Sequence, residues 1–443
     1  MDFLEACEAV ETAISEIWER DGYEASDGIN LQKRAIIGYR KDVDVIQKLI
    51  KRVLDGKGLT VEAPGWYDGP EHAIFHEVWG WAGMAEWFGP AWAESSSAKI
   101  IGERIYYLKD GEMRLMPQRI TKERQSQLIR ALLLLSPEER LDKEFHEVYM
   151  LDGTRVTIFH RGMTKGEQDV IIFRRYIIPI YSFEEQASRG TIPAEAIPLF
   201  ENMVKTGYNV VFTGSVRSAK TTFLSTWQSR ENPRLEGVMV ETDPEIPLHR
   251  LMPDAPVIQL LADGDSLSRI SKNLMRSDAD YFIMAEARDG IALDTAVRLA
   301  RKGTKRMKMT FHTRDPKDFA MEAAIEITRS VGGDPAETAL RVAGSFDYIF
   351  HFVNHRRANR KKLSAIYEIG VSGEAGDTRK ADRVYTREIC RYDFSADTWR
   401  WTYRIGEDKR RYGEEEDREA FMAFESCLAG LSNGGRRGDE FTS

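Results

Sequence analysis

The sequence lacks several features that would place the protein in particular classes. Its three cysteines, Cys7, Cys390 and Cys427, lie far apart, so we expect neither a disulfide framework nor a cysteine-based metal site. No run of about 18 apolar residues is present, so no transmembrane helix is expected. The first residues are acidic and are not followed by an apolar stretch, so no signal peptide is expected. These absences fit a protein of the reducing cytoplasm.

An excess of positive charge is also absent. The formal net charge is −8, which argues against bulk affinity for nucleic acid and leaves room only for a local basic groove. Apolar residues make up 42% of the chain and charged residues 30%, as in a soluble globular protein. The 443 residues are enough for two to four domains, and we find no fixed-period repeat.

Patterns along the chain predict an α/β protein in four parts. Residues 1–58 have helical apolar spacing and predict a helical hairpin that stops at 55–56, with an oligomer contact as the alternative. Residues 59–185 predict a smaller mixed α/β domain with a tryptophan-rich core. Residues 186–412 alternate strand and helix patterns, end in a β-rich part, and predict a larger α/β domain. Residues 413–443 predict a last helix to about Leu431 and a disordered tail.

The most informative stretch is residues 209–224, NVVFTGSVRSAKTTFL. It predicts a buried strand, a tight loop from Gly214 and a helix beginning near Lys220. This is the layout of a phosphate-binding loop, in which backbone N–H groups surround a phosphate, a lysine neutralises it and a hydroxyl ligates Mg²⁺. The pattern has glycine before the lysine, whereas this chain has Ala219.

Later strands end in residues that could act on a bound nucleotide. Glu241 follows one apolar strand, with Glu245 soon after, Glu286 follows a second strand, and His312 follows a third. Because ligands of open α/β sheets bind at the carboxyl ends of the strands, we expect these side chains to lie close to the loop. Nucleotide hydrolysis needs such carboxylates beside the metal and the attacking water. The phosphate-binding loop and the residues at these strand ends together predict a nucleotide site.

In this order the motifs resemble those of the type II/type IV secretion ATPases, closest to the Flp (tight-adherence) pilus assembly branch. The phosphate loop is GSVRSAKTT, the acidic box VETDPEI, the Walker B region SKNLMRSDADYFIMAEARDGIALD and the histidine box MTFHTRDP. Upstream, DGTRV and VIIFRRY resemble the end of the family's N-terminal domain. The resemblance covers roughly residues 60–405, and its specific part is 208–315.

The resemblance implies ATP and Mg²⁺ as cofactors and suggests a role for each matching residue. The implied phosphate-binding residues are Gly214, Ser215, Arg217, Ser218, Ala219, Lys220, Thr221 and Thr222, with Arg155 and Arg174 reaching toward nucleotide or a neighbouring subunit. The implied catalytic residues are Glu241, Glu286, His312, Arg276 and Arg288. Thr221 would ligate Mg²⁺, Glu286 would hold metal-bound water, and Glu241 would act as the general base. Lys220 would bind the β/γ-phosphates, and His312 would couple the γ-phosphate to the next domain.

The resemblance also implies an assembly. A RecA-like P-loop ATPase domain, residues 186–412, would be joined by a linker to a mobile N-terminal domain. Six copies would form a homo-oligomeric ring docked on an inner-membrane platform protein, so the protein would be cytoplasmic and peripherally associated with the inner face of the cell membrane. ATP turnover would move the domains and drive pilin assembly or protein secretion. Nucleic acid is not an expected partner.

The sequence departs from the family pattern at several positions. The departures are Ala219, Thr242, Ala285, Ile291, Thr304 and Arg306, of which Ala219, Ala285 and Arg306 replace glycines. A Cβ at position 219 could crowd the phosphate, and a positive φ there would add strain on the order of 1 kcal/mol. Because the lysine, threonine, glutamates and histidine persist, we expect a working ATPase, with reduced activity left open.

Two alternatives follow. Ala219 and Ala285 motivate a nucleotide-binding assembly subunit that hydrolyses weakly or not at all. The basic stretches 301–308 and 355–362 motivate a DNA-handling motor, the less favoured alternative, whose signature would be salt-dependent DNA binding and DNA-stimulated turnover. A charged hairpin tip is the other interpretation of 355–362.

Overall fold

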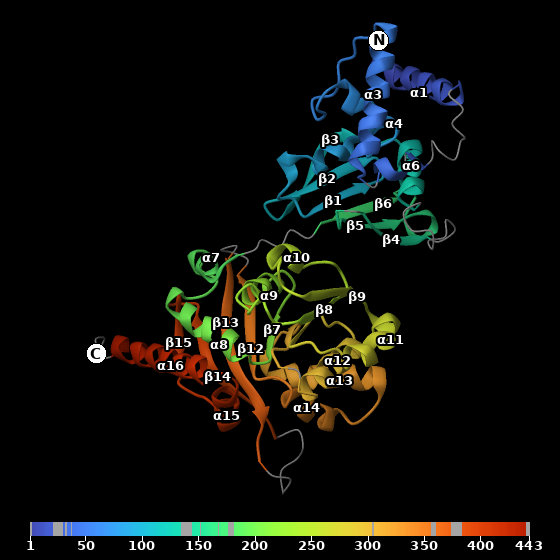
Figure 1. Ribbon diagram of the computed structural model, residues 1–443. Coiled ribbons are helices and arrows are strands. Elements are labelled where there is room, and N and C mark those ends of the chain that lie inside the picture. The colour runs from blue at the N-terminus through green and yellow to red at the C-terminus, as the bar shows by residue number, and fades with distance from the viewer. Residues whose placement is uncertain are drawn as a thin grey trace. The chain divides into compact units, whose positions relative to one another are not determined.

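The computed structural model describes residues 2–20, 30–36 apart from 32, 38–133, 144–175 apart from 151 and 167, 181–303, 305–355, 360–373 and 383–439. The chain forms two compact units, Met1–Ile177 and Ile178–Ser443. Figure 1 shows the elements of each unit. Among the described residues, no helix combines the length and apolar character that crossing a bilayer requires.

In the first unit, helices α1 (Phe3–Arg20), α3 (Arg40–Lys57) and α4 (Pro70–Val78) enclose an apolar core. The helical apolar spacing seen in residues 1–58 is confirmed, because Val10 and Ile14 of α1 and Ile46 and Ile50 of α3 are buried there. Helix α3 continues past the expected stop at 55–56. It ends where Gly58 adopts a left-handed φ of 61° and its N–H donates to carbonyls of the last turn, a conformation that glycine adopts without a Cβ clash.

The rest of the first unit is built on a six-stranded antiparallel sheet in the order β3-β2-β1-β6-β5-β4. Its strands are β1 (Ser97–Ile101), β2 (Arg104–Lys109), β3 (Glu112–Arg119), β4 (Phe145–Tyr149), β5 (Arg155–Phe159) and β6 (Val170–Arg174). Helix α6 (Lys122–Leu133) shares a core with this sheet and with Trp87, which is fully buried as expected. Strand β5 begins at Arg155, after a turn in which the Asp152 side chain accepts a hydrogen bond from the Thr154 N–H. Residue 151 lies outside the described residues.

The second unit contains a nine-stranded sheet in the order β15-β14-β13-β12-β7-β11-β10-β8-β9. Its strands are β7 (Val210–Gly214), β8 (Gly237–Glu241), β9 (Val257–Leu261), β10 (Tyr281–Ala285), β11 (Lys308–Phe311), β12 (Tyr348–His355), β13 (Arg360–Val371), β14 (Val384–Asp393) and β15 (Thr398–Trp401). Neighbours from β12 to β9 are parallel, whereas β12 to β15 pair antiparallel. The expected fold class, an α/β domain with a β-rich C-terminal part, is confirmed.

Helices cover both faces of this sheet (Figure 1). The helices are α7 (Phe183–Ser188), α8 (Ile197–Thr206), α9 (Lys220–Gln228), α10 (Leu248–Leu251), α11 (Gly264–Leu274), α12 (Gly290–Arg301), α13 (Phe319–Val331), α14 (Pro335–Ala343), α15 (Glu407–Glu416) and α16 (Arg418–Asp439). One apolar core joins α8, α9 and α16 to the sheet through Phe212 and Phe350. A second core joins α11, α12, α13 and α14 to the other face through Val211 and Ile349. Central strand β7 is therefore buried on both faces.

The C-terminal helices differ from the expectation. Instead of one helix over 414–431, α15 begins at Glu407 and α16 begins at Arg418. The Asp417 side chain accepts a hydrogen bond from the Ala420 N–H, which satisfies a free donor at the start of α16. Helix α16 then continues to Asp439 through the segment expected to be disordered. It includes Gly434 and Gly435, although glycine is about 1 kcal/mol less favourable than alanine in a helix interior.

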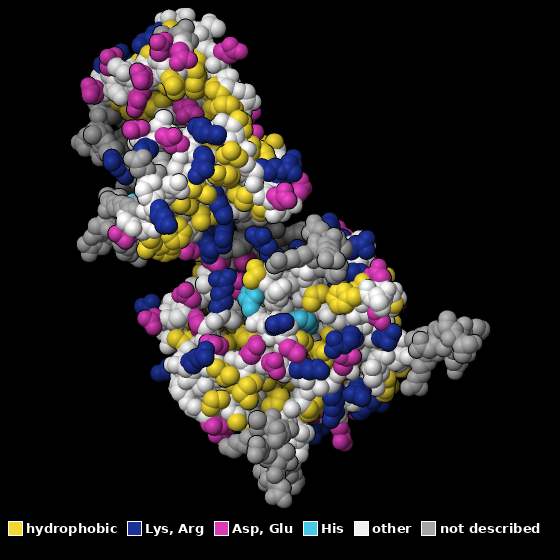
Figure 2. All heavy atoms as spheres, turned by 180° about the vertical axis from the view of Figure 1, so that it is seen from behind, with side chains coloured by type: hydrophobic (Ala, Val, Ile, Leu, Met, Phe, Trp, Pro, Cys, Tyr) yellow, Lys and Arg dark blue, Asp and Glu magenta, His cyan; other side chains and the backbone are white. Residues whose placement is uncertain are grey.

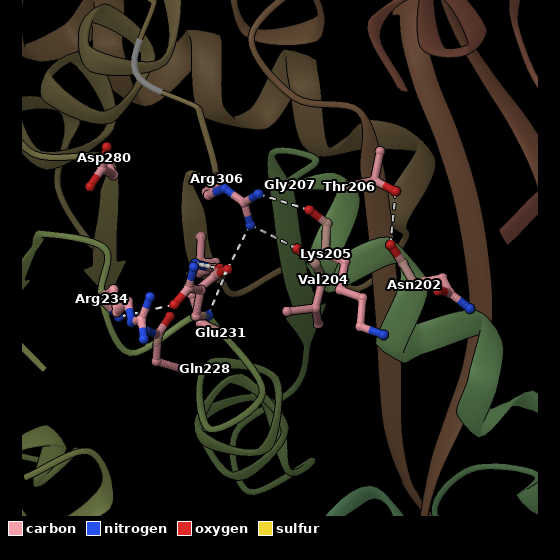
Figure 3. Close-up of polar contacts among 12 residues, drawn as sticks. Asn202, Val204, Lys205, Thr206, Gly207, Gln228, Glu231, Arg234, Asp280 and Arg306 are labelled. Atoms are coloured by element: carbon pink, nitrogen blue, oxygen red, sulfur yellow. Dashed lines mark hydrogen bonds and ion pairs between the residues drawn. The ribbon is translucent and has the colours of Figure 1, made fainter. Parts of the chain in front are cut away.

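An ion cluster at the amino-terminal edge of the sheet ties α8, α9 and β11 together (Figure 3). The carboxylate of Glu231 accepts hydrogen bonds from Arg306 and from Lys308, each at 2.6 Å. Glu231 and Lys308 are both fully buried. The guanidinium of Arg306 also donates to the carbonyls of Val204 and Lys205 in the last turn of α8. Arg306 adopts a φ of 61°, so the chain keeps a glycine-like backbone at this position and uses the side chain as a helix cap.

Candidate nucleotide-binding site

The phosphate loop lies where the sequence predicts it. Strand β7 ends at Gly214 between parallel neighbours β11 and β12, and α9 begins at Lys220. Gly214 has a φ of 140°, and a Cβ there would lie 2.1 Å from the carbonyl oxygen of Phe352. Only glycine fits this position, so the loop can turn sharply and point its N–H groups and the start of α9 toward the same space.

Ala219 adopts the left-handed conformation, with φ 86° and ψ 14°, directly before α9. The residue is buried, and its strained backbone is held by the surrounding loop. A non-glycine residue in this region costs on the order of 1 kcal/mol. The loop therefore keeps the backbone shape that glycine favours, and the substitution adds strain.

We expect Ala219→Gly to stabilise the second unit by up to about 1 kcal/mol, because it removes this strain while adding entropy to the unfolded chain. Urea unfolding measures the change. Ala285→Gly is the matched control: Ala285 ends β10 without a positive φ, so glycine there is expected to destabilise by about 0.5–1 kcal/mol. Equal destabilisation by both substitutions would contradict the strain at position 219.

The side chain of Lys220 folds back onto the phosphate loop. Its ammonium group donates to the carbonyls of Gly214 at 3.0 Å and Ser215 at 2.8 Å, and lies 3.3 Å from Nδ1 of His312. Burial lowers the pKa of Lys220 to about 8, against the opposing charges of Glu286 and Glu245. The lysine is thus held at the base of the loop by contacts that a phosphate could replace.

The two glutamates of the acidic box have different roles: Glu241 stabilises the backbone of the turn, whereas Glu245 faces the phosphate loop. Oε1 of Glu241 accepts hydrogen bonds from the backbone N–H groups of Glu245 at 3.2 Å and Ile246 at 3.0 Å. Burial raises the pKa of Glu241 to about 8. Burial and the charge of Glu286 raise the pKa of Glu245 to about 7, while a hydrogen bond with Thr221 lowers it. Glu245, which follows the tip of β8, is therefore the acidic-box carboxylate that contacts Thr221.

Glu286 lies beside the loop at the end of β10. Its N–H donates to the hydroxyl of Thr310, and the residue has a φ of 62°, a strained conformation of the kind that clusters at functional sites. Its Oε1 forms an ion pair with Arg288 and lies 3.8 Å from Nε2 of His312. Although burial raises the pKa of Glu286, hydrogen bonds with His312 and Arg288 bring it below its usual value, so the carboxylate is ionised. Arg288 also lies 4.0 Å from buried Asp243.

The residues present fit a nucleotide with Mg²⁺. Within the described residues, Oε2 of Glu286 and the hydroxyl of Ser218 are buried without a hydrogen-bond partner, and both belong to the site. A magnesium ion takes a few protein oxygens and keeps several waters, so Thr221 and Glu286 suffice without a larger cluster. Among the described residues, no group of three or more His, Cys, Asp and Glu side chains has the arrangement of a metal site.

The sequence reasoning missed His351, which lies on β12 beside the loop. Its Nδ1 is 3.0 Å from the hydroxyl of Thr213, and burial lowers its pKa to about 4, so it is neutral. The register of β12 with β7 pairs these two residues directly. A histidine in the middle of an apolar strand was the available signal. It stabilises the end of β7, from which the phosphate loop departs.

Three sequence-predicted residues belong to segments other than those that form this cluster. Arg276 follows α11 and precedes β10, so it lies near the amino-terminal edge of the sheet, opposite the loop, and its catalytic role stays a prediction. Arg155 and Arg174 lie in the first unit, where they are direct cross-strand neighbours on β5 and β6. Arg155 also pairs with Glu147 at 3.3 Å. Roles for Arg155 and Arg174 toward nucleotide stay predictions.

No family model and no curated protein matches the sequence. Similar solved structures include the ATPase DotB of Legionella pneumophila, with 15% identity, a TM-score of 0.44 and coverage of 76% of this chain and 85% of that chain. The pilus retraction motor PilT with bound ADP has 13% identity, a TM-score of 0.44 and coverage of 74% and 84%. The VirB11 ATPase of a Brucella suis type IV secretion system, in complex with sulphate, has 14% identity, a TM-score of 0.35 and coverage of 64% and 92%. Similarity at these levels assigns no activity to this chain.

Proposed function

We propose that the protein is a Mg²⁺-dependent ATPase. The observation that carries this proposal is the convergence of Lys220, Thr221, Glu245, Glu286 and His312 at one edge of a parallel sheet, around a loop with a phosphate-binding backbone. Lys220 would neutralise the phosphates, and Thr221 and Glu286 would hold Mg²⁺ with its waters. Bound Mg²⁺ would neutralise charge that develops on the transferred phosphoryl group.

In this site Glu245 is the best-placed general base. It contacts Thr221 and is not held by backbone N–H groups, whereas Glu241 supports the turn that presents Glu245. We therefore move the general-base role predicted for Glu241 to Glu245. His312 lies between Lys220 and Glu286, so it could respond to the loss of the terminal phosphate.

The finer proposal is a motor of a pilus or protein-secretion machine. It rests on the ordered motif series, from the phosphate loop to the histidine box. It includes the assembly that the resemblance implies: a hexameric ring, an inner-membrane platform protein and a location at the inner face of the cell membrane. The Flp branch is part of this proposal. Pull-down of full-length protein with candidate multi-spanning membrane partners, together with its mass in solution, would test the assembly.

We expect Lys220→Ala to weaken MgADP binding by about 10- to 100-fold, because a charge-assisted contact to phosphate is lost. Titration with a fluorescent nucleotide measures binding, and phosphate release with and without Mg²⁺ measures turnover. Lys317→Ala is the control, since Lys317 is an exposed lysine in the second unit. The proposal would be contradicted if the wild-type protein neither binds nucleotide nor releases phosphate at any protein concentration.

A non-hydrolysing, nucleotide-binding subunit is the second candidate. The strained Ala219 and the inward-turned Lys220 favour it, and tight binding without turnover would be its signature. A DNA-handling motor is less supported, because Lys305, Arg306 and Lys308 of the basic stretch 301–308 form internal ion pairs with Glu416 and Glu231. Residues 356–359 of the second stretch lie outside the described residues. On the face drawn in Figure 2, acidic and basic side chains of the second unit are interspersed.

A further inference from the structure

Three basic side chains from separate segments converge on the side of the phosphate loop away from the carboxylates. We name Arg189, Arg217 and Lys361 the cationic rim. Arg189 caps α7, Arg217 is in the phosphate loop with a φ of 62°, and Lys361 is the second residue of β13. The catalytic scheme proposed above uses none of the three.

Strand register brings these segments to one level. Phe352 of β12 pairs with Gly214 of β7 and with Leu363 of β13, so these three residues lie abreast across the sheet. Beyond this level the chain continues as the phosphate loop on β7 and as Lys361 on β13. Lys361 pairs with Asn354 of β12, two residues past Phe352, so it stands beyond the level at which β7 ends and the phosphate loop begins.

A hydrogen bond brings Arg189 to the same place. The N–H of Leu363 donates to the carbonyl of Thr191 at 2.8 Å, which fixes the segment after α7 against the start of β13. The guanidinium of Arg189 lies 4.0 Å from the centre of the Tyr181 ring. This contact holds the guanidinium in place without neutralising it.

The three charges differ from those of their neighbours in their ion pairing. Within the described residues, none of them forms an ion pair with a carboxylate, whereas neighbouring Arg360 and Lys362 both pair with Asp397, at 3.8 and 3.2 Å. Burial and the positive charges of Arg189 and Arg217 lower the pKa of Lys361. Like charges held together in this way disfavour one another until an anion binds among them.

The strand order indicates which part of a bound nucleotide lies next to the cationic rim. Strands β11, β10 and β8, which carry His312, Glu286 and the acidic box, all lie on one side of β7, and β12 and β13 lie on the other. If the terminal phosphate faces the carboxylates, the nucleoside end of the ligand faces β13. We propose that the cationic rim binds the phosphate nearest the nucleoside, the α-phosphate, of the bound nucleoside triphosphate. This inference rests on the proposed ATPase function.

The test uses the full-length protein and the variants Lys361→Gln and Arg189→Gln/Lys361→Gln. Because a contact to a non-reacting phosphate is equally strong in the ground and transition states, Lys361→Gln is expected to raise KM for ATP about tenfold and to change kcat less than about twofold. MgADP affinity should fall by a similar factor of about ten. Lys361→Arg should restore both values, since it keeps the charge.

Arg360→Gln is the matched control, because it removes the same charge one residue away, where Asp397 already pairs with it. If the double variant has the same KM and the same MgADP affinity as this control, the proposed role of the cationic rim is wrong. The ATPase proposal would then remain intact. A fall in kcat at unchanged KM would also overturn the proposed role of the rim, because the rim would then act on the reacting phosphate. Wild-type protein that binds no nucleotide would overturn both proposals.

Discussion

Replacing Glu245 by glutamine is expected to lower Mg²⁺-dependent phosphate release by about 100- to 10,000-fold, the range for loss of a general base. Glutamine keeps the size of the side chain and can still hydrogen-bond to Thr221, but it cannot accept a proton from water. MgADP affinity should therefore stay close to that of the wild type. Single-turnover phosphate release, with binding measured separately, distinguishes a loss of chemistry from a loss of affinity.

Glu241→Gln is the control for this prediction. Its amide oxygen can accept the same bonds from the N–H groups of Glu245 and Ile246, so the turn that presents Glu245 should persist. We expect turnover within about tenfold of the wild type, well above that of Glu245→Gln. An inactive Glu241→Gln beside an active Glu245→Gln would return the general-base role to Glu241.

Replacing Glu231 by glutamine is expected to destabilise the second unit by about 3–5 kcal/mol, the usual cost of breaking a buried ion pair. Lys308 would keep a buried charge without a carboxylate, and Arg306 would lose its link between α8 and α9. In the wild type the charges of Lys308 and Arg306 outweigh the burial of Glu231 and lower its pKa. The stability from this pairing is thus present above the ordinary glutamate pKa and is lost as pH falls through the lowered one.

Urea unfolding at neutral pH, followed by circular dichroism, measures this change. Glu236→Gln is the control, because Glu236 is exposed near the same edge of the sheet, and it should change stability by less than about 0.5 kcal/mol. The double variant Glu231→Gln/Lys308→Met should lose less than the sum of the two single losses, since it removes both charges. Strictly additive losses, or a Glu231→Gln protein as stable as the control, would show that the cluster does not act as a unit.

The sequence predicted the parts of this fold that depend on local pattern. The apolar run ending in Gly214 and the Lys-Thr pair predict a strand, a loop and a helix start, and the structure has all three. Strands that end at Glu241, at Ala285 before Glu286 and at Phe311 before His312 are also confirmed. Because parallel strands share a carboxyl edge, the convergence of these residues follows from the strand pattern alone.

What the sequence could not predict depends on backbone angles and distant partners. No local pattern gives the sign of φ at Ala219, which the surrounding loop imposes. The choice between Glu241 and Glu245 depends on which carboxylate the turn itself uses. Arg306 and Lys308 suggest a basic surface in sequence, but their partner Glu231 lies more than seventy residues earlier. Such pairs appear only once the sheet is assembled.

The position of β7 in the sheet has a consequence for biosynthesis. Its neighbours are β11 and β12, and Val210 pairs with Lys308 and with Tyr348. The strand that carries the phosphate loop is therefore paired on both sides only after residue 348 has been synthesised. Contacts between residues so far apart in sequence form slowly, because a long loop must close first. While the ribosome adds these residues, an apolar strand with two open edges stays exposed to other chains. The same centrality that buries the loop in the finished protein makes it one of the last parts to become competent for nucleotide, and exposes the nascent chain to aggregation until then.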